Sequence, residues 1–225
     1  FTHSNGMDYV KIESVALVTG LRGTGEDPPA TPQRAALLSE MKQRQVENPN
    51  AVLSSLDTAI VNVRAFIRPG AREGDRIDVE VRVPSRSETT SLRGGWMLPS
   101  RMTPLAVLGG QIHSGHVLAV AEGPILVDPL ADAEAGEVRA VHGRILGGGV
   151  VTKSRELGLV IDGRRRSYNM AINTAKSINQ RFYVRAGGRK QGVANPKSDE
   201  YIELVVADRY QDNIGRYIQV IRNMA

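Results

Sequence analysis

One stretch of regular alternation constrains the fold of this chain more than any other feature. Between residues 58 and 84, two runs of alternating apolar and polar side chains flank the turn-rich segment 68–74, which holds Pro69, Gly70 and Gly74. A period of two places one face of a strand in the core and the other in water. The pattern therefore predicts a β-hairpin over residues 58–84. Its expected core positions are Ala59, Val61, Val63, Ala65, Ile67, Ile77, Val79, Val81 and Val83.

Shorter strand-like runs occur along the rest of the chain. Aromatic residues make up only 4% of the 225 residues, so the core must be built from Val, Ile, Leu and Ala. A chain of this length can bury a true core and fits one large domain or two small ones. The further expected strands are Val10–Val18, His116–Ala121, Val138–Ile145, Leu157–Ile161 and Tyr201–Val206.

Two segments carry clear helix-start signals. Thr31 can cap the first helix, and Pro32 then occupies the first helical position, where its missing N–H costs nothing. Asn48-Pro49 is expected to end that helix, because the residue before a proline disfavours helical geometry. Ser167 can cap the second helix, whose apolar residues recur at helical spacing as far as Phe182.

A third helix is expected near the end of the chain. Asp208 would be its N-cap, with Gln211 three residues later in a variant of the capping box. Gly215 within this helix would weaken it by about 1 kcal/mol relative to alanine. The apolar stripe consists of Tyr210, Ile214, Tyr217, Ile218 and Ile221.

These elements predict an α+β fold with two small modules, in which mixed or antiparallel sheets pack against helices. Residues 1–150 would form a strand-rich N-terminal module, and residues 151–225 a C-terminal module with the order strand, helix, strand, helix. The glycine run Gly147-Gly148-Gly149 is the expected boundary, because successive glycines are typical of a connection.

Composition limits the classes of function. The net charge of +5 and the pI of about 9.7 favour an anionic partner. The basic residues are spread out apart from Arg164-Arg165-Arg166, which is expected to be a solvated turn, and they lack the interleaved aromatics of a nucleic-acid site. The chain has no cysteine, which removes disulfides and thiolate metal sites. No stretch approaches the roughly 20 apolar residues of a membrane helix, so membrane insertion is not expected. Nucleic-acid binding is not expected either, because of the missing aromatics.

The motifs that could suggest catalysis are incomplete. The segment 20–25, Gly-Leu-Arg-Gly-Thr-Gly, lacks the Gly-Lys-Ser/Thr of a phosphate loop and is followed by Glu26-Asp27, whose carboxylates repel phosphate. His113 and His116 lack the glutamate and the helix of a zinc protease motif. There is no Gly-x-Ser-x-Gly elbow, and no pair of carboxylates can be placed about one substrate bond. We therefore expect no catalytic residue, cofactor or metal, and interpret segment 20–25 as a structural turn.

One glycine-flanked segment, Ser91–Leu98, differs from an ordinary connection. It contains Arg93, the glycines Gly94 and Gly95, and Trp96, which is the only tryptophan. One interpretation is a turn with a single exposed aromatic residue. The other, which we favour, is a contact loop, because Trp and Arg are common anchors at protein interfaces.

The chain resembles the flagellar P-ring protein family through short motifs that occur in the same order. Segment 16–25 is similar to the family's VGL-x-GTG stretch, and Pro69-Gly70 with Gly74–Val79 resembles its PG-x-x-ID-V hairpin. Residues 91–95 match SLRGG and residues 102–105 match MTPL. The remaining similar segments are 117–123, 143–145, 173–182 and 221–224.

This resemblance implies a structural subunit that is not an enzyme. Copies would form a periplasmic ring that acts as a bushing around the flagellar rod within the peptidoglycan layer, and that partners with the outer-membrane ring. Export would require a leader that is absent from this chain. The family continues beyond the point where this chain stops, and the loop 96–101 is longer here, which indicates a divergent member or an N-terminal fragment.

Two other functions stay open on the sequence. The chain could be a periplasmic binding module for a cell-wall polymer or another anionic ligand, without ring formation. It could also be an enzyme acting on a wall polymer, for which converging carboxylates or a metal would be required.

Overall fold

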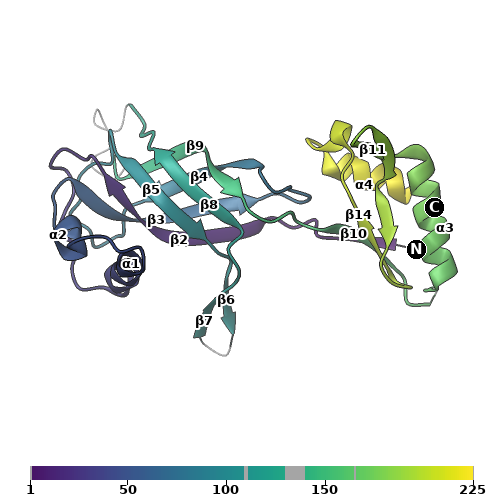
Figure 1. Ribbon diagram of the computed structural model, residues 1–225, viewed down its shortest axis with the longest axis horizontal. Coiled ribbons are helices and arrows are strands. Elements are labelled where there is room, and N and C mark those ends of the chain that lie inside the picture. The colour runs from purple at the N-terminus through teal and green to yellow at the C-terminus, as the bar shows by residue number, and fades with distance from the viewer. Residues whose placement is uncertain (1, 109–110, 130–139, 165, 225) are drawn as a thin grey trace. The chain divides into compact units, whose positions relative to one another are not determined.

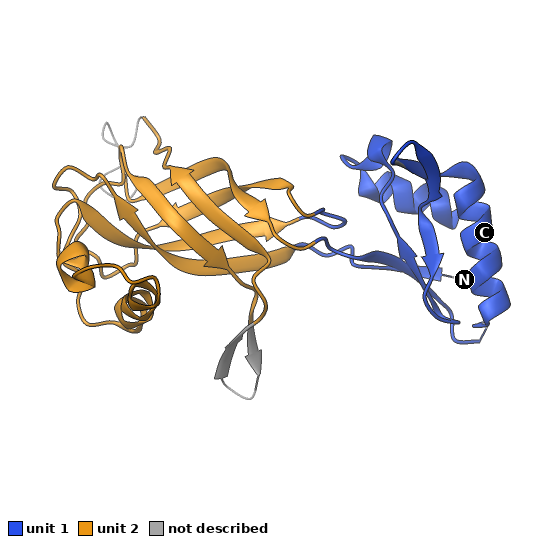
Figure 2. Ribbon diagram, viewed as in Figure 1, with its two compact units in different colours: residues 1–9, 68–72, 154–225 blue, residues 10–67, 73–153 orange. Residues whose placement is uncertain are grey.

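The computed structural model describes residues 2–108, 111–129, 140–164 and 166–224, with the backbone alone for residues 106–108, 111–114 and 186. The chain divides into two compact units, which Figure 2 shows in different colours. The barrel unit comprises residues 10–67 and 73–153, and the C-terminal unit comprises residues 1–9, 68–72 and 154–225. Both units contain antiparallel sheets and helices, so the predicted α+β class is confirmed.

The barrel unit is a closed antiparallel barrel (Figure 1). The predicted hairpin over residues 58–84 is confirmed, because β3 (Thr58–Ile67) and β4 (Arg76–Arg82) pair antiparallel with Val63 opposite Val81. A separate two-stranded hairpin, β6 (Leu105–Leu108) and β7 (Gln111–Ser114), follows β5 (Trp96–Met102). The barrel order is β2 (Val10–Thr19), β3 (Thr58–Ile67), β4 (Arg76–Arg82), β9 (His142–Val151), β8 (Ala119–Pro124) and β5 (Trp96–Met102).

The barrel interior consists mainly of aliphatic side chains, which alternate with exposed ones along β4 and much of β3. Val61 and Val79, for example, are fully buried, as the period-two pattern predicted. In β5 the buried residues are Met97, Ser100 and Met102, spaced by a register shift. Strands were also predicted over Val10–Val18 and His116–Ala121, and the structure places them as β2 and, shifted by three residues, β8. The strand expected over Val138–Ile145 begins at His142 in the described residues, whereas its first two positions lie outside them.

The glycine run Gly147-Gly148-Gly149 lies inside β9, so the interpretation of this run as a connection was wrong. A Cβ atom on Gly148 would lie 2.7 Å from the carbonyl oxygen of Glu122 and would overlap the side chain of Ile145. Close packing across the barrel wall therefore requires glycine here.

Two short helices cover the outer surface of β2 and β3. Helix α1 (Pro32–Gln43) begins as predicted, since the Thr31 hydroxyl accepts a hydrogen bond from the backbone N–H of Arg34 at 3.2 Å. It ends at Gln43 and not at Asn48-Pro49, because Gln45 has a φ of 58°, which a continuing α-helix does not allow. Pro49 instead opens helix α2 (Pro49–Leu53). The helices enclose a small cluster of Leu17, Leu37, Met41, Leu53 and Ile60.

The C-terminal unit is an open antiparallel sheet with two helices (Figure 1). Its order is β1 (Thr2–Asn5), β10 (Leu157–Ile161), β14 (Tyr201–Leu204) and β13 (Ala194–Pro196). The expected modules were 1–150 and 151–225, whereas in the structure β1 pairs with β10, so residues 1–9 group with the C-terminal unit. The other elements are α3 (Tyr168–Arg181), β11 (Tyr183–Ala186), β12 (Arg189–Gly192), the 3₁₀ turn η1 (Asp208–Tyr210) and α4 (Ile214–Arg222).

The helix caps of this unit follow the prediction in one case and not in the other. Ser167 caps α3 by accepting from the N–H of Met170 at 3.1 Å, which confirms the second predicted helix. Asp208 does not cap the last helix, because its carboxylate pairs with Arg72 at 3.2 Å. Asn213 caps α4 instead, by accepting from the N–H of Arg216 at 2.9 Å.

Buried aromatic rings hold the core of the C-terminal unit together. The ring of Phe182 meets those of Tyr210 and Tyr217 edge to face, with centroids 5.7 Å and 5.3 Å apart. Tyr217 is fully buried and its hydroxyl donates to the carbonyl oxygen of Val205 at 2.9 Å. Burial, together with the nearby Tyr210, raises the pKa of Tyr217 well above its ordinary value.

Candidate functional site

The loop that precedes β5 is shaped by its two glycines. Gly94 has a φ of 72°, in the left-handed region that favours glycine. A Cβ atom on Gly95 would lie 2.6 Å from the side chain of Val18 and 2.8 Å from that of Leu21. Both glycines therefore have a structural reason to be present.

Arg93 binds its own chain. Its guanidinium donates to the carbonyl oxygens of Asp128 at 3.1 Å and Pro129 at 3.0 Å. The side chain thereby ties the loop before β5 to the segment that follows β8. The structure thus gives Arg93 a positioning contact within the barrel unit.

Trp96 is the largest exposed side chain of this loop. It begins β5 between Thr19 of β2 and Pro124 of β8, and 49% of its surface is exposed. An exposed tryptophan on a rigid strand loses little conformational freedom on binding, which suits an interface anchor. Of the four predicted contact residues, Trp96 is the one with a large, half-exposed apolar side chain.

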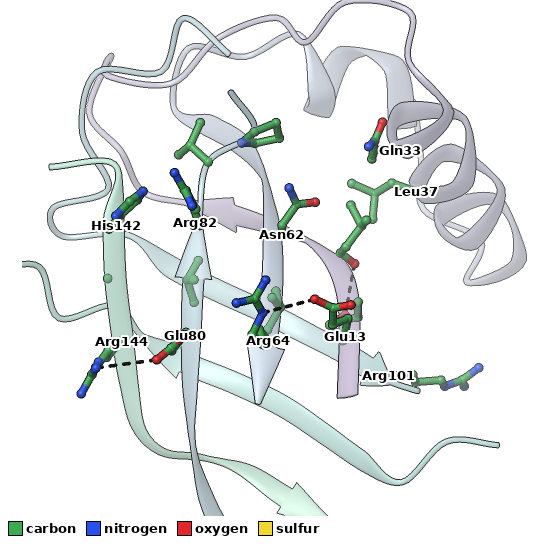
Figure 3. Close-up of a pocket in the computed structure, with 18 of the residues that line it drawn as sticks. Glu13, Gln33, Leu37, Asn62, Arg64, Glu80, Arg82, Arg101, His142 and Arg144 are labelled. Carbon is green, nitrogen blue, oxygen red and sulfur yellow. Dashed lines mark hydrogen bonds and ion pairs between the residues drawn. The ribbon is translucent and has the colours of Figure 1, made fainter. Parts of the chain in front are cut away.

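A groove lies elsewhere on the outside of the barrel, between the sheet and α1 (Figure 3). Its floor is the outer face of β2, β3, β4 and β9, and Gln33 and Leu37 of α1 form one wall. The segment Leu126–Asp128 also lines it. The groove holds about 1380 Å³, which exceeds the roughly 300–1,000 Å³ of typical small-molecule sites. The open shape suits an extended segment better than a compact substrate.

One row of charged side chains crosses the groove floor with alternating sign. Glu13, Arg64, Glu80 and Arg144 lie directly opposite one another on four adjacent strands. Arg64 pairs with Glu13 at 3.2 Å and Arg144 with Glu80 at 3.6 Å, as Figure 3 shows. Burial raises the pKa of Glu13, but hydrogen bonds from Lys11 and Arg64 outweigh it and leave the pKa below its ordinary value. The row is therefore balanced in charge.

The neighbouring row, Asn62, Arg82 and His142, is not balanced. The three residues are opposite one another on β3, β4 and β9. Within the described residues, Arg82 makes no ion pair. Burial, and then the charge of Arg82, lower the pKa of His142. An anionic group between these two side chains would pair with Arg82 and raise the pKa of His142.

Sequence reasoning missed this groove, although part of the signal was present. The alternation that revealed the core of the hairpin also places Asn62, Arg64, Glu80 and Arg82 on its polar face. The pairing of β4 with β9, however, joins residues that are 60 to 74 positions apart, and no local pattern reveals that register.

The glycine-rich segment that resembles a phosphate loop has a structural role. Segment 20–25 is a turn, in which the N–H of Gly23 donates to Asp57 at 2.8 Å and the N–H of Gly25 donates to the carbonyl of Leu56 at 2.7 Å. Among the described residues, no group of three or more His, Asp or Glu side chains could hold a metal ion. The side chain of His113 lies outside the described residues, as does Arg165 of the arginine run.

In the part of the chain that the structure describes, no helix combines the length and apolar character needed to cross a membrane.

Comparison with known proteins gives one consistent match. The family model for FlgI, the flagellar P-ring protein, matches residues 1–225. Flagellar P-ring proteins from Geotalea uraniireducens and Thermotoga maritima are each 28% identical, over 98% and 93% of this chain. The flagellar P-ring protein from Rhizobium johnstonii is 31% identical over 92% of this chain.

The match does not extend over the whole of these relatives. The chain spans 58%, 60% and 55% of the Geotalea, Thermotoga and Rhizobium proteins. Within this chain, however, the similarity covers both the barrel unit and the C-terminal unit. On that evidence, the chain belongs to the flagellar P-ring protein family.

Proposed function

We propose that this chain is a structural subunit of the flagellar P ring and works by packing against copies of itself. The observation that carries the proposal is the family match over all 225 residues. The turn at residues 20–25, in which the N–H of Gly23 donates to Asp57, has a structural use, as a building block requires. Ring closure requires one face of a subunit to meet a different face of the next.

The location and partners of the subunit belong to the same proposal. The ring would lie in the periplasm as part of the basal body, around the rod and within the peptidoglycan layer. Its partners would be further copies of the chain, the rod, the outer-membrane ring and peptidoglycan. The relatives are named as P-ring proteins, which supports this placement.

Trp96 is the proposed contact anchor, with Arg93, Gly94 and Gly95 holding its loop in place. Replacing a buried interface tryptophan by alanine typically costs about 2 kcal/mol or more, which is roughly a 30-fold weaker association. Sedimentation velocity of the purified chain over a range of protein concentrations measures this change. We expect concentration-dependent assembly of the wild-type chain and much weaker assembly of Trp96→Ala.

Tyr168→Ala is a matched control, because it also removes an exposed aromatic ring. Tyr168 lies in the C-terminal unit and is 66% exposed. Its assembly should equal that of the wild type. The melting temperature of Trp96→Ala should be nearly unchanged, since the side chain is half exposed. A wild-type chain that stays monomeric at every concentration would contradict the proposed function.

A second candidate function is a module that binds an anionic wall polymer. The unbalanced row of Arg82 and His142 favours it. Purified peptidoglycan should then retain the chain at low salt and release it at high salt, because exposed charges are screened beyond roughly 10 Å at 0.1 M salt. Arg82→Gln should lose this retention, and retention that salt leaves unchanged would count against the module.

A further inference from the structure

The barrel carries an exposed patch around Trp96. On its outer surface, Trp96 of β5 lies directly opposite Pro124 of β8. Further along these two strands the register shifts, so that Leu98 and Pro99 together oppose Glu122. All five side chains are exposed. We call Trp96, Leu98, Glu122 and Pro124 the Trp96 patch, which combines a large ring and two apolar side chains with one carboxylate.

Glu122 gives the Trp96 patch a negative charge that its surroundings do not balance. Within the described residues its carboxylate makes no ion pair, even with Arg101, which lies further along the neighbouring strand. The guanidinium of Arg44 reaches the carbonyl oxygen of Pro99 at 3.3 Å, but it is already paired with Glu40 at 2.5 Å. The patch therefore has a carboxylate to offer to a cation of another molecule.

The positive charge of the chain has its source in the C-terminal unit. Residues 167–198 contain six of the 29 Lys and Arg residues and none of the 24 Asp and Glu residues. The six cations are Lys176, Arg181, Arg185, Arg189, Lys190 and Lys197. A segment with cations alone cannot neutralise its own charge, so it favours contact with carboxylates that lie elsewhere.

The hairpin of β11 and β12 displays part of this charge on one face. Arg185 lies directly opposite Lys190, and both side chains project from the same face. Tyr183, two residues before Arg185, shares that face, and the Lys190 ammonium lies 4.6 Å from the centre of its ring. We call Tyr183, Arg185 and Lys190 the basic face of the hairpin.

The basic face is turned toward solvent. Val184, on the opposite face, packs against the core of the C-terminal unit. The three residues of the basic face are all exposed, and among the residues that the structure describes neither Arg185 nor Lys190 makes an ion pair. By contrast, Lys197 pairs with Glu203 at 3.0 Å. The basic face therefore presents cations that its own unit does not neutralise.

We propose that the Trp96 patch of one copy binds the basic face of the hairpin in the next copy, an inference that rests on the proposed function. Glu122 would pair with Arg185 or Lys190, and a cation can also lie over the face of the Trp96 ring. Tyr183 adds a second exposed ring, and Trp, Tyr and Arg are the residue types enriched at interfaces.

A second copy of the chain fits these surfaces better than a wall polymer does. An anionic polymer would neutralise the basic face but would leave the apolar part of the Trp96 patch in water. A second copy supplies a partner for both surfaces at once. One surface lies on the barrel unit and the other on the C-terminal unit, so the contact joins unlike faces and can continue from copy to copy.

Charge reversal on each surface tests the contact. Glu122→Arg reverses the charge of the Trp96 patch, and Arg185→Glu/Lys190→Glu reverses that of the basic face. Because like charges would then face each other, each variant alone should associate at least about tenfold more weakly than the wild type in sedimentation velocity. A chain that carries all three substitutions should regain most of the lost association, since its charges are exchanged. Circular dichroism checks that each variant is folded.

Lys153→Glu/Arg209→Glu is the matched control, because it makes the same change in net charge as the reversed basic face at exposed positions outside both surfaces. It should assemble as the wild type does. A triple variant that is folded but associates no better than its parents would overturn the inference, because the two surfaces then do not meet.

Two further outcomes separate this inference from the proposed function. Normal assembly of Arg185→Glu/Lys190→Glu would overturn the inference and leave the function standing; if that variant also loses retention on peptidoglycan, the basic face serves a wall polymer. A wild-type chain that never assembles would refute the function itself.

Discussion

The barrel unit and the C-terminal unit reach a stable core by different routes. The barrel closes on itself, so it has no free sheet edges, and small aliphatic side chains fill its interior. The C-terminal sheet is open, and its core depends on two helices and on the rings of Phe182 and Tyr217, the only fully or nearly buried aromatic residues in the described chain. The few buried rings of this aromatic-poor chain thus lie in the unit whose sheet does not close into a barrel.

The two units also differ in how they carry charge. On the barrel, Glu13, Arg64, Glu80 and Arg144 form a row in which each charge faces its opposite. In the C-terminal unit, residues 167–198 carry cations alone. A balanced surface is suited to remaining solvated, whereas an unbalanced one is suited to meeting a partner of opposite charge.

Removal of the Tyr217 ring from the core of the C-terminal unit should cause the largest loss of stability. We expect Tyr217→Ala to destabilise that unit by about 3–5 kcal/mol, because large buried rings leave cavities that the surroundings fill only partly. Peptide-resolved hydrogen exchange in denaturant would follow α3 and α4, while fluorescence of Trp96, the single tryptophan, would follow the barrel. The barrel transition should not move.

Tyr217→Phe is the matched variant, since it keeps the ring and removes only the hydrogen bond to Val205. It should cost about 1 kcal/mol. An equal loss of stability in both transitions after Tyr217→Ala would show that the two units do not have separate cores.

A change of intermediate size is expected in the barrel wall. The added methyl group of Gly148→Ala would collide with Ile145 and with the carbonyl of Glu122, so we predict a loss of about 1–3 kcal/mol in the Trp96 transition. Gly163→Ala, in a turn of the C-terminal unit with no atom within 4 Å of the added carbon, should be nearly neutral. A neutral Gly148→Ala would mean that the barrel wall is packed more loosely than these contacts imply.

The smallest expected effect concerns pH and the unbalanced row of the barrel. Burial and Arg82 hold the pKa of His142 below 6.5 in the folded chain, so the unfolded chain binds a proton more readily. The contribution of His142 to stability is complete above pH 6.5 and is lost as the pH falls below it. NMR titration of the imidazole should show this low pKa, and Arg82→Gln should raise it; an unchanged pKa in that variant would remove Arg82 as a cause.

Local patterns predicted the parts of this fold that depend on neighbouring residues. The hairpin over 58–84 and the caps at Thr31 and Ser167 follow from alternation and from hydrogen bonds within one helical turn. The cap at Asp208 was predicted wrongly because its carboxylate is taken by Arg72, 136 residues away. The glycine run that contains Gly148 was interpreted as a connection, because its close neighbour Glu122 lies on another strand and is not visible in the local sequence.

The candidate site was predicted in part. The sequence singled out Arg93, Gly94, Gly95 and Trp96, but only the structure separates the exposed tryptophan from an arginine that binds its own chain. The outer groove depends on the register of strands distant in sequence, which composition cannot supply. The positive charge of residues 167–198 forms no local run, because its six cations are spread along the segment, which is distinguished by its lack of carboxylates.

The central claim is that successive copies meet through unlike faces, and chemical cross-linking of the wild-type chain tests it most directly. Brief treatment with a lysine-reactive cross-linker, at protein concentrations where the chain assembles, should give a ladder of dimers, trimers and larger multimers, because contacts between unlike faces continue from copy to copy. The same treatment of Trp96→Ala should give a much weaker ladder. A wild-type chain that yields monomers alone, or dimers and nothing larger, would contradict head-to-tail packing.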